Sequence, residues 1–173
     1  MKTLLLMLGF ISTLFGFSDS IYSFSASFEQ RIVDDQNKTI TYYGNVWSKR
    51  PDMALWKYEK PIEKSVYIRG KRVVIIEPEL EQALIKNINN DIDFFAIISA
   101  AKPIGKGKYQ TNYMDQIFTI TLKQGVIERI EYQDTFENKV VMQFSDQRQN
   151  KLIDDEKFTA KVPKEYDIIK ERL

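Results

Sequence analysis

The chain has 173 residues, which suffices for one domain with a substantial core and is too short for two. Its formal net charge is +1, with acids and bases mixed along the chain, so it lacks the basic stripe of a nucleic-acid-binding protein. It contains no Cys and no His, which excludes thiol nucleophiles, Ser-His dyads and the usual zinc ligands. An enzyme built from this sequence would have to use carboxylates, Lys, Tyr or Ser. We expect no nucleic-acid partner, no metal, no cofactor and no catalytic residues.

Residues 1–18 have the composition of a secretory signal peptide. Lys2 precedes an apolar run over residues 4–17, and small residues flank the expected cleavage site. The run is shorter than the roughly 20 residues that span a bilayer as a helix, although an uncleaved N-terminal anchor is the alternative. We predict a signal peptide at 1–18 and a single mature domain at 19–173, present as a monomer in the periplasm.

The first half of the mature chain is predicted to form antiparallel β-strands. Residues 23–32 alternate strictly, with Phe24 and Phe28 on one face, which is the period of a half-buried strand. Pro51 interrupts the next β-rich segment because proline cannot donate a ladder hydrogen bond. Gly70 marks a hairpin turn. The other predicted strands are 39–48, a segment with Ala54, Trp56 and Tyr58 on one face, 65–68 and 73–76.

One short helix is predicted over residues 91–101. Asp91 or Asp93 can cap it, and Pro103 stops it. Its apolar residues are too many for one narrow face, so the helix needs apolar surroundings on more than one side. They are Phe94, Phe95, Ile97 and Ile98. The preceding residues 80–88 fit a helix by propensity and a strand by length.

The second half returns to strands. Residues 116–123 and 126–132 form a hairpin pattern around Gly125, and residues 138–144 follow. Residues 158–162 are predicted as the final strand, with a loosely held charged tail after them. Residues 105–108 are predicted as a flexible basic turn. The sum is an α+β fold, in which one antiparallel sheet of consecutive hairpins curls into an incomplete barrel with a helix inserted.

A sheet of this kind normally covers its apolar face. Here many strands have one apolar face, and only one helix is predicted to cover them. A curled sheet under one helical lid would therefore leave an apolar concave cavity. Such cavities bind hydrophobic ligands. Alternation alone nevertheless favours plain core over a ligand-binding wall for the face of Phe24 and Phe28.

Several motifs resemble those of the outer-membrane lipoprotein carrier (LolA) family. Residues 23–30 (SFSASFEQ) resemble its F-x-A-x-F-x-Q opening, and residues 44–51 (GNVWSKRP) resemble its G-x-[LF]-[WY]-x-[KR]-R-P segment. Trp56, Tyr58 and Pro61 fit the following W-x-[YM]-x-x-P, and residues 70–82 are similar to its G-K…P-x-x-E-Q stretch. The motifs run in order over nearly the whole mature chain.

This resemblance implies a periplasmic chaperone that is not an enzyme. Such a protein takes acylated lipoproteins from an inner-membrane ABC-type exporter and passes them to an outer-membrane receptor; the sequence does not decide whether that receptor is a separate protein. Arg50 would latch the lid by pointing its guanidinium at carbonyl groups. The lid would be formed by Phe94, Phe95, Ile97 and Ile98. The acyl chains would contact Phe24, Phe28, Val46, Trp56, Tyr58, Phe118, Ile120, Val140 and Met142.

Two features depart from the family pattern. The family places a helix before the first strand motif, and residues 18–22 leave almost no room for one. The family also tends to have Phe two residues before the tryptophan, where this chain has Ala54.

Three other functions stay open on the sequence. They are a carrier of free lipid or glycolipid on the same fold, an envelope interaction module with a filled core, and a carboxylate-based envelope hydrolase. The hydrolase needs two acids within an apolar wall, and no strand pattern places them there.

Overall fold

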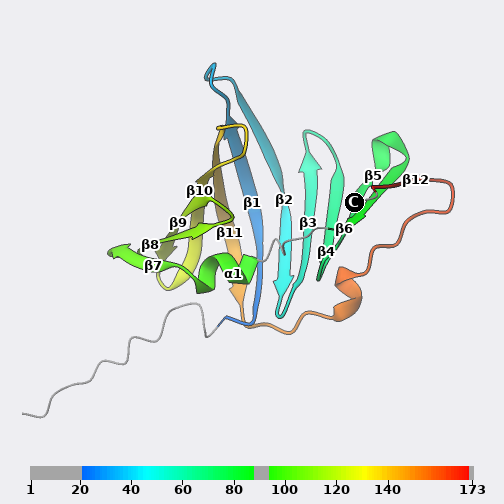
Figure 1. Ribbon diagram of the computed structural model, residues 1–173. Helices are drawn as coiled ribbons and strands as arrows, with labels where there is room; N and C mark the ends of the chain where they lie inside the picture. Colours follow the sequence, from blue (N-terminus) through cyan, green and yellow to red (C-terminus); the bar gives the residue numbers. More distant parts are fainter. Residues whose placement is uncertain (1–20, 88–93, 172–173) are drawn as a thin grey trace, which may run out of the picture.

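The computed structural model describes residues 21–87 and 94–171, which form one twelve-stranded sheet (Figure 1). Its order is β12-β6-β5-β4-β3-β2-β1-β11-β10-β9-β8-β7. The strands are β1 (Ser23–Val33), β2 (Thr39–Lys49), β3 (Met53–Lys60), β4 (Lys64–Arg69), β5 (Arg72–Glu77), β6 (Gln82–Asn87), β7 (Lys102–Gly105), β8 (Lys108–Tyr113), β9 (Gln116–Lys123), β10 (Val126–Gln133), β11 (Lys139–Gln149) and β12 (Asp167–Lys170). The described helices are α1 (Phe94–Ser99) and the 3₁₀ turns η1 (Pro78–Leu80) and η2 (Asp155–Phe158).

Consecutive hairpins build each half of the sheet, and the pairing of β1 with β11 joins the two halves. In two of the hairpin turns, an aspartate side chain accepts hydrogen bonds from backbone N–H groups of the turn. The Asp34 carboxylate accepts hydrogen bonds from the backbone N–H groups of Gln36 and Lys38, at 3.0 and 2.7 Å. The Asp134 carboxylate accepts from the N–H groups of Phe136 and Asn138, both at 2.9 Å. An aspartate that replaces a backbone acceptor in this way fixes a short turn locally.

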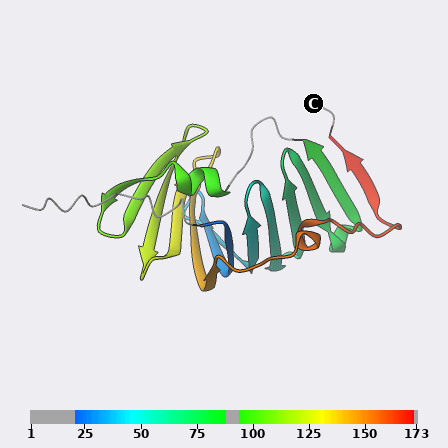
Figure 2. The same cartoon turned by 90° about the horizontal axis from the view of Figure 1, so that it is seen from below.

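One face of the sheet carries the main apolar core. The expected alternation of β1 is confirmed, since Phe24, Ala26 and Phe28 are buried on this face with Val46 of β2 and Phe144 of β11. Figure 2 shows α1 lying over this face, and its Phe95 and Ile98 are fully buried there. Cross-strand packing on this face therefore holds the two halves of the sheet together.

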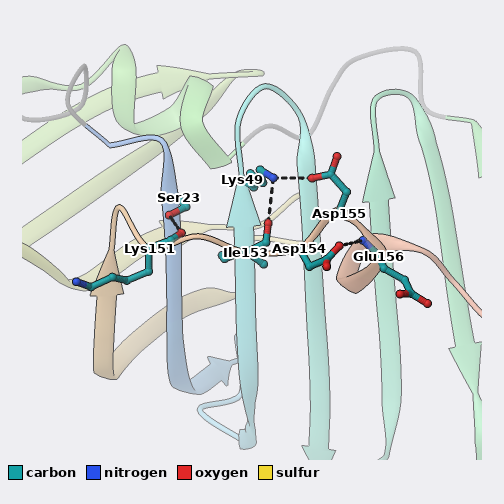
Figure 3. Close-up of polar contacts among 7 residues, drawn as sticks. All are labelled: Ser23, Lys49, Lys151, Ile153, Asp154, Asp155 and Glu156. Atoms are coloured by element: carbon teal, nitrogen blue, oxygen red, sulfur yellow. Dashed lines mark hydrogen bonds and ion pairs between the residues drawn. The ribbon is translucent and has the colours of Figure 1, made fainter.

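The opposite face of β3–β5 is covered by the chain that follows β11, which we call the strap (residues 150–166). Phe158 is 2% exposed and packs with Met53 and Leu55 of β3. Close to it, the Lys49 ammonium donates to the carbonyl oxygen of Ile153 at 2.9 Å and pairs with the Asp155 carboxylate (Figure 3). That contact lowers the pKa of Asp155 below its ordinary value of 3.8. The strap thus closes the outer side of the sheet with an apolar anchor and an ion pair.

The end of the chain differs from the expectation. A final strand over residues 158–162 is wrong, because the Asp154 carboxylate accepts from the N–H of Glu156 at 3.0 Å and starts η2 instead. The last strand is β12, which is the only described strand to pair in parallel, along β6. The expectation of a loosely held tail is therefore wrong for residues 167–170. An added strand protects the edge that β6 would otherwise present to solvent.

Two other expectations are resolved by the sheet. The ambiguous residues 80–88 contain β6, a strand that pairs with β5 over its whole length. Residues 102–113 form the unpredicted hairpin β7–β8, with the predicted basic turn between the two strands. The strand β7 lies at the edge of the sheet, where a residue such as Pro103 costs no ladder hydrogen bond.

The expected helix is confirmed but short. It has six residues, Phe94–Ser99, while the predicted caps Asp91 and Asp93 lie outside the described residues, as does the predicted signal peptide at 1–18. Within the described residues the sheet is open and α1, with six residues, is its only α-helix, so the expected helical lid over the sheet is not confirmed. No helix in residues 21–87 or 94–171 is long and apolar enough to cross a bilayer.

Candidate functional site: an apolar cavity under the short helix

A cavity of about 470 Å³ lies between α1 and the face of the sheet that carries the main core. This volume is within the roughly 300–1,000 Å³ of typical small-ligand sites. Its wall comes from both halves of the sheet, so the cavity exists only because the sheet curves. The wall residues are Gln30, Ala54, Trp56, Tyr58, Val66, Ile68, Phe94, Ile97, Tyr113, Met114, Gln116, Phe118, Ile130, Tyr132, Thr135 and Met142.

The predicted acyl-binding residues divide into two groups. Trp56, Tyr58, Phe118 and Met142 line the cavity. The others are packed in the core and do not line it: Phe24, Phe28, Val46, Ile120 and Val140.

The buried group supports the cavity wall from below. The ring of Phe28 packs edge-on against Trp56 and Tyr58, with centroids 5.4 and 5.1 Å apart. Edge-to-face contacts of this kind hold aromatic rings in fixed orientations. Phe28 therefore positions two wall residues.

The helix residues divide in the same manner. Phe94 and Ile97 line the cavity, whereas Phe95 and Ile98 are fully buried in the core. Phe94 also stacks on Phe24 of β1, with ring centroids 5.1 Å apart. Since α1 both lines the cavity and packs against β1, any movement of the helix would change the shape of the cavity.

Arg50 connects α1 to the end of β2. Its Nε donates to the carbonyl oxygen of Ile21 at 2.9 Å, and one terminal nitrogen donates to the Ser99 hydroxyl at 2.8 Å. Its guanidinium lies 4.9 Å from the centroid of the Phe95 ring. The arginine thus contacts the last turn of α1 through two different interactions.

The wall also contains polar groups that the sequence reading did not select. Gln30 is 8% exposed and lines the cavity, which the continued alternation after Phe28 could have indicated. Burial raises the pKa of the Tyr58 hydroxyl, with smaller contributions from Tyr132 and Tyr42. Burial also raises the pKa of Tyr132, together with the nearby Asp134 carboxylate. Both hydroxyls therefore stay protonated at neutral pH.

The described part of the cavity wall lacks the paired carboxylates of a hydrolase. Among the described residues the wall includes no Asp or Glu, so the pair of carboxylates that a hydrolase requires is not present there. Nor do the described residues bring together three Asp or Glu side chains that could hold a metal ion. A concave, mainly apolar wall with a few polar groups is typical of a site for an apolar ligand.

Similarity to known proteins agrees with this geometry. The chain matches the family model described as outer membrane lipoprotein carrier protein LolA over residues 19–99. An outer-membrane lipoprotein carrier protein of Campylobacter jejuni is 36% identical over 170 residues, covering 98% of this chain and 99% of the relative. That of Wolinella succinogenes is 35% identical over 172 residues, covering 99% of this chain and all of the relative.

Solved structures share the fold at much lower identity. A LolA superfamily protein from Nitrosomonas europaea matches with a TM-score of 0.52 at 13% identity, over 83% of this chain and 94% of that one. An uncharacterised conserved protein from Thermus thermophilus matches with a TM-score of 0.55 at 11% identity, over 89% and 93%. At these identities the two likenesses show a shared fold and nothing further.

Proposed function

The chain belongs to the outer-membrane lipoprotein carrier (LolA) family, and from this premise we propose that it shelters lipoprotein acyl chains in its cavity and carries them across the periplasm. The observation that carries the proposal is the cavity of about 470 Å³ with a mainly apolar wall. Because an exposed acyl chain costs roughly 0.8 kcal/mol per CH₂ in water, such a wall supplies the driving force for loading. The protein acts as a carrier and not as an enzyme.

The proposed role as a lipoprotein carrier implies two partners, one at each membrane. Cargo would come from an inner-membrane exporter and leave to an acceptor at the outer membrane, and the signal peptide at 1–18 would bring the monomeric carrier into the periplasm. The cavity has to bind tightly enough to take the acyl chain out of a membrane-bound exporter. It also has to bind weakly enough for the acceptor to remove it.

Mass spectrometry of the protein purified from the periplasm tests this function. We expect acylated polypeptides to co-purify with the carrier and to be extracted by organic solvent. Phospholipid or glycolipid as the sole extracted molecule would favour a carrier of free lipid instead. A protein with no bound amphiphile and no uptake of a neutral fluorescent acyl ligand would contradict the proposal.

The helix α1 would act as the lid and Arg50 as its latch. The contacts of Arg50 with Ser99 and Phe95 hold α1 against the end of β2, and cargo in the cavity would compete with this position of the helix. Without the contacts of Arg50, the helix position that competes with cargo is less stable. The carrier should therefore hold its cargo longer.

Replacing Arg50 by Leu should leave folding and loading intact and slow the release of cargo to purified outer membranes. Transfer of a radiolabelled lipoprotein measures this rate. Ser99→Ala removes one of the two contacts with α1 and should give an intermediate rate. Arg72→Leu, at an exposed arginine of β5, is the control and should transfer normally. Normal transfer by Arg50→Leu would rule out the latch.

A further inference from the structure

A lysine lies directly beside the cavity wall, held by two tyrosine rings. Lys64 is the first residue of β4 and pairs across the ladder with Tyr58 of β3, so the two side chains share the cavity face. The Lys64 ammonium lies 4.7 Å from the ring centroid of Tyr58 and 5.7 Å from that of Tyr42. The two rings pack edge-on at 5.8 Å. Tyr58 is itself a wall residue, so the ammonium is one side chain away from the cavity.

This ammonium has no counter-ion in the described chain. Lys64 is half-buried, and it takes part in none of the ion pairs that the described residues form. Aromatic faces attract a cation without neutralising it, so the positive charge remains available to a further partner.

Two neighbouring cross-strand pairs on β1 to β4 bring polar side chains close to this lysine. Gln30 of β1 pairs with Tyr42 of β2, and Tyr58 of β3 pairs with Lys64 of β4. Within the described residues, the Gln30 amide and the Tyr58 hydroxyl have no side-chain hydrogen-bond partner. The next positions of β3 and β4 along the same face are apolar, namely Trp56 and Val66.

On β3 and β4 the cavity face thus has one positive charge, at Lys64, next to an apolar stretch formed by Trp56 and Val66. A molecule that matches both features has an acyl chain and an anionic group at its head. The neutral Tyr58 hydroxyl can donate to the same anion.

We propose that Lys64, with Tyr42 and Tyr58, binds the anionic head group of an acyl-chain ligand whose tail lies in the cavity towards α1. This inference rests on the acyl-binding cavity of the proposed function and adds a preference for charge. The carboxylate of a fatty acid and the phosphate of a single-chain phospholipid share this chemistry. The cavity thereby distinguishes anionic amphiphiles from neutral ones and orients them in one direction.

A matched pair of fluorescent ligands tests the proposal on the purified mature protein. Parinaric acid and its methyl ester share the same chain and differ in the head-group charge. We expect the acid to bind about tenfold more tightly than the ester, because one charge-assisted hydrogen bond contributes an affinity difference of about this size. Lys64→Met should remove this preference by weakening acid binding about tenfold and leaving ester binding unchanged. Lys64→Arg should retain the preference.

Lys57→Met is the control, because Lys57 precedes Tyr58 on β3 and points to the opposite face. It should bind both ligands as the unaltered protein does. Raising the salt concentration should weaken acid binding by the unaltered protein and not by Lys64→Met. Thermal unfolding of each variant checks that the fold is intact.

The outcomes separate the two proposals. Equal binding of acid and ester, or an unchanged preference in Lys64→Met, would overturn the role of Lys64 and leave the acyl cavity standing. Failure of both ligands to bind would overturn the cavity itself. Displacement of parinaric acid by palmitate, by lysophosphatidylglycerol or by both would support the site and identify which anion it accepts. Displacement by neither would overturn the proposal.

Discussion

Replacing Phe158 by Ala is expected to lower the free energy of unfolding by about 3–5 kcal/mol, the usual cost of truncating a buried phenylalanine. The side chain is 2% exposed and packs with Met53 and Leu55, and Lys49 anchors the preceding residues of the strap through Ile153 and Asp155. Loss of the ring leaves a void between the strap and β3 that the sheet cannot close. Urea unfolding measures the change.

Leu152→Ala provides the matched control within the same strap. Leu152 is 92% exposed, so its truncation removes almost no buried surface and should change the free energy of unfolding by less than about 0.5 kcal/mol. Hydrogen exchange should also accelerate in β12 of Phe158→Ala, because β12 follows the strap. A loss below about 1 kcal/mol for Phe158→Ala would mean that the strap adds little to the stability of the sheet.

Replacing Val66 by Trp is expected to abolish the binding of a neutral acyl ligand, with a loss of affinity of at least about tenfold. Val66 lines the cavity on β4 and pairs across the ladder with Trp56, so an indole at this position would occupy the space that the acyl chain needs. Titration with methyl parinarate measures the affinity, and a neutral ligand keeps the result independent of Lys64.

Val141→Trp is the control for this experiment. Val141 lies on β11 between the buried Val140 and Met142, so its side chain points to the opposite face of the sheet. The same change of residue there should leave ligand binding intact. Unaltered binding by Val66→Trp would show that the ligand does not occupy the cavity. Urea unfolding of both variants separates loss of the site from loss of the fold.

Local patterns were sufficient for most strands and for the short helix. The alternation around Phe24 and Phe28, the break at Pro51 and the turn at Gly70 each depend on backbone geometry within a few residues. The Asp34 turn is equally local, because the carboxylate and the N–H groups that it binds lie within four residues. Such features are encoded wherever they occur in the chain.

The strap and β12 could not be predicted in this way. Residues 158–162 look like a strand, but Phe158 finds its partners on the outer face of β3, about a hundred residues earlier in the chain. The pairing of β12 with β6 is likewise a contact between distant segments, and β6 itself pairs with the neighbouring β5. Contacts of this kind depend on which face is left uncovered once the hairpins have assembled.

The sequence by itself determined the family, the succession of hairpins and which side chains share a face of the sheet. The tertiary structure decided which of those side chains are core and which border the cavity, as the separation of Phe28 from Trp56 and of Phe95 from Phe94 illustrates. It also decided that Lys64 stands beside the cavity wall. The physical reason is that alternation assigns a residue to a face, whereas the curvature of the whole sheet and the position of α1 determine how much of that face is filled.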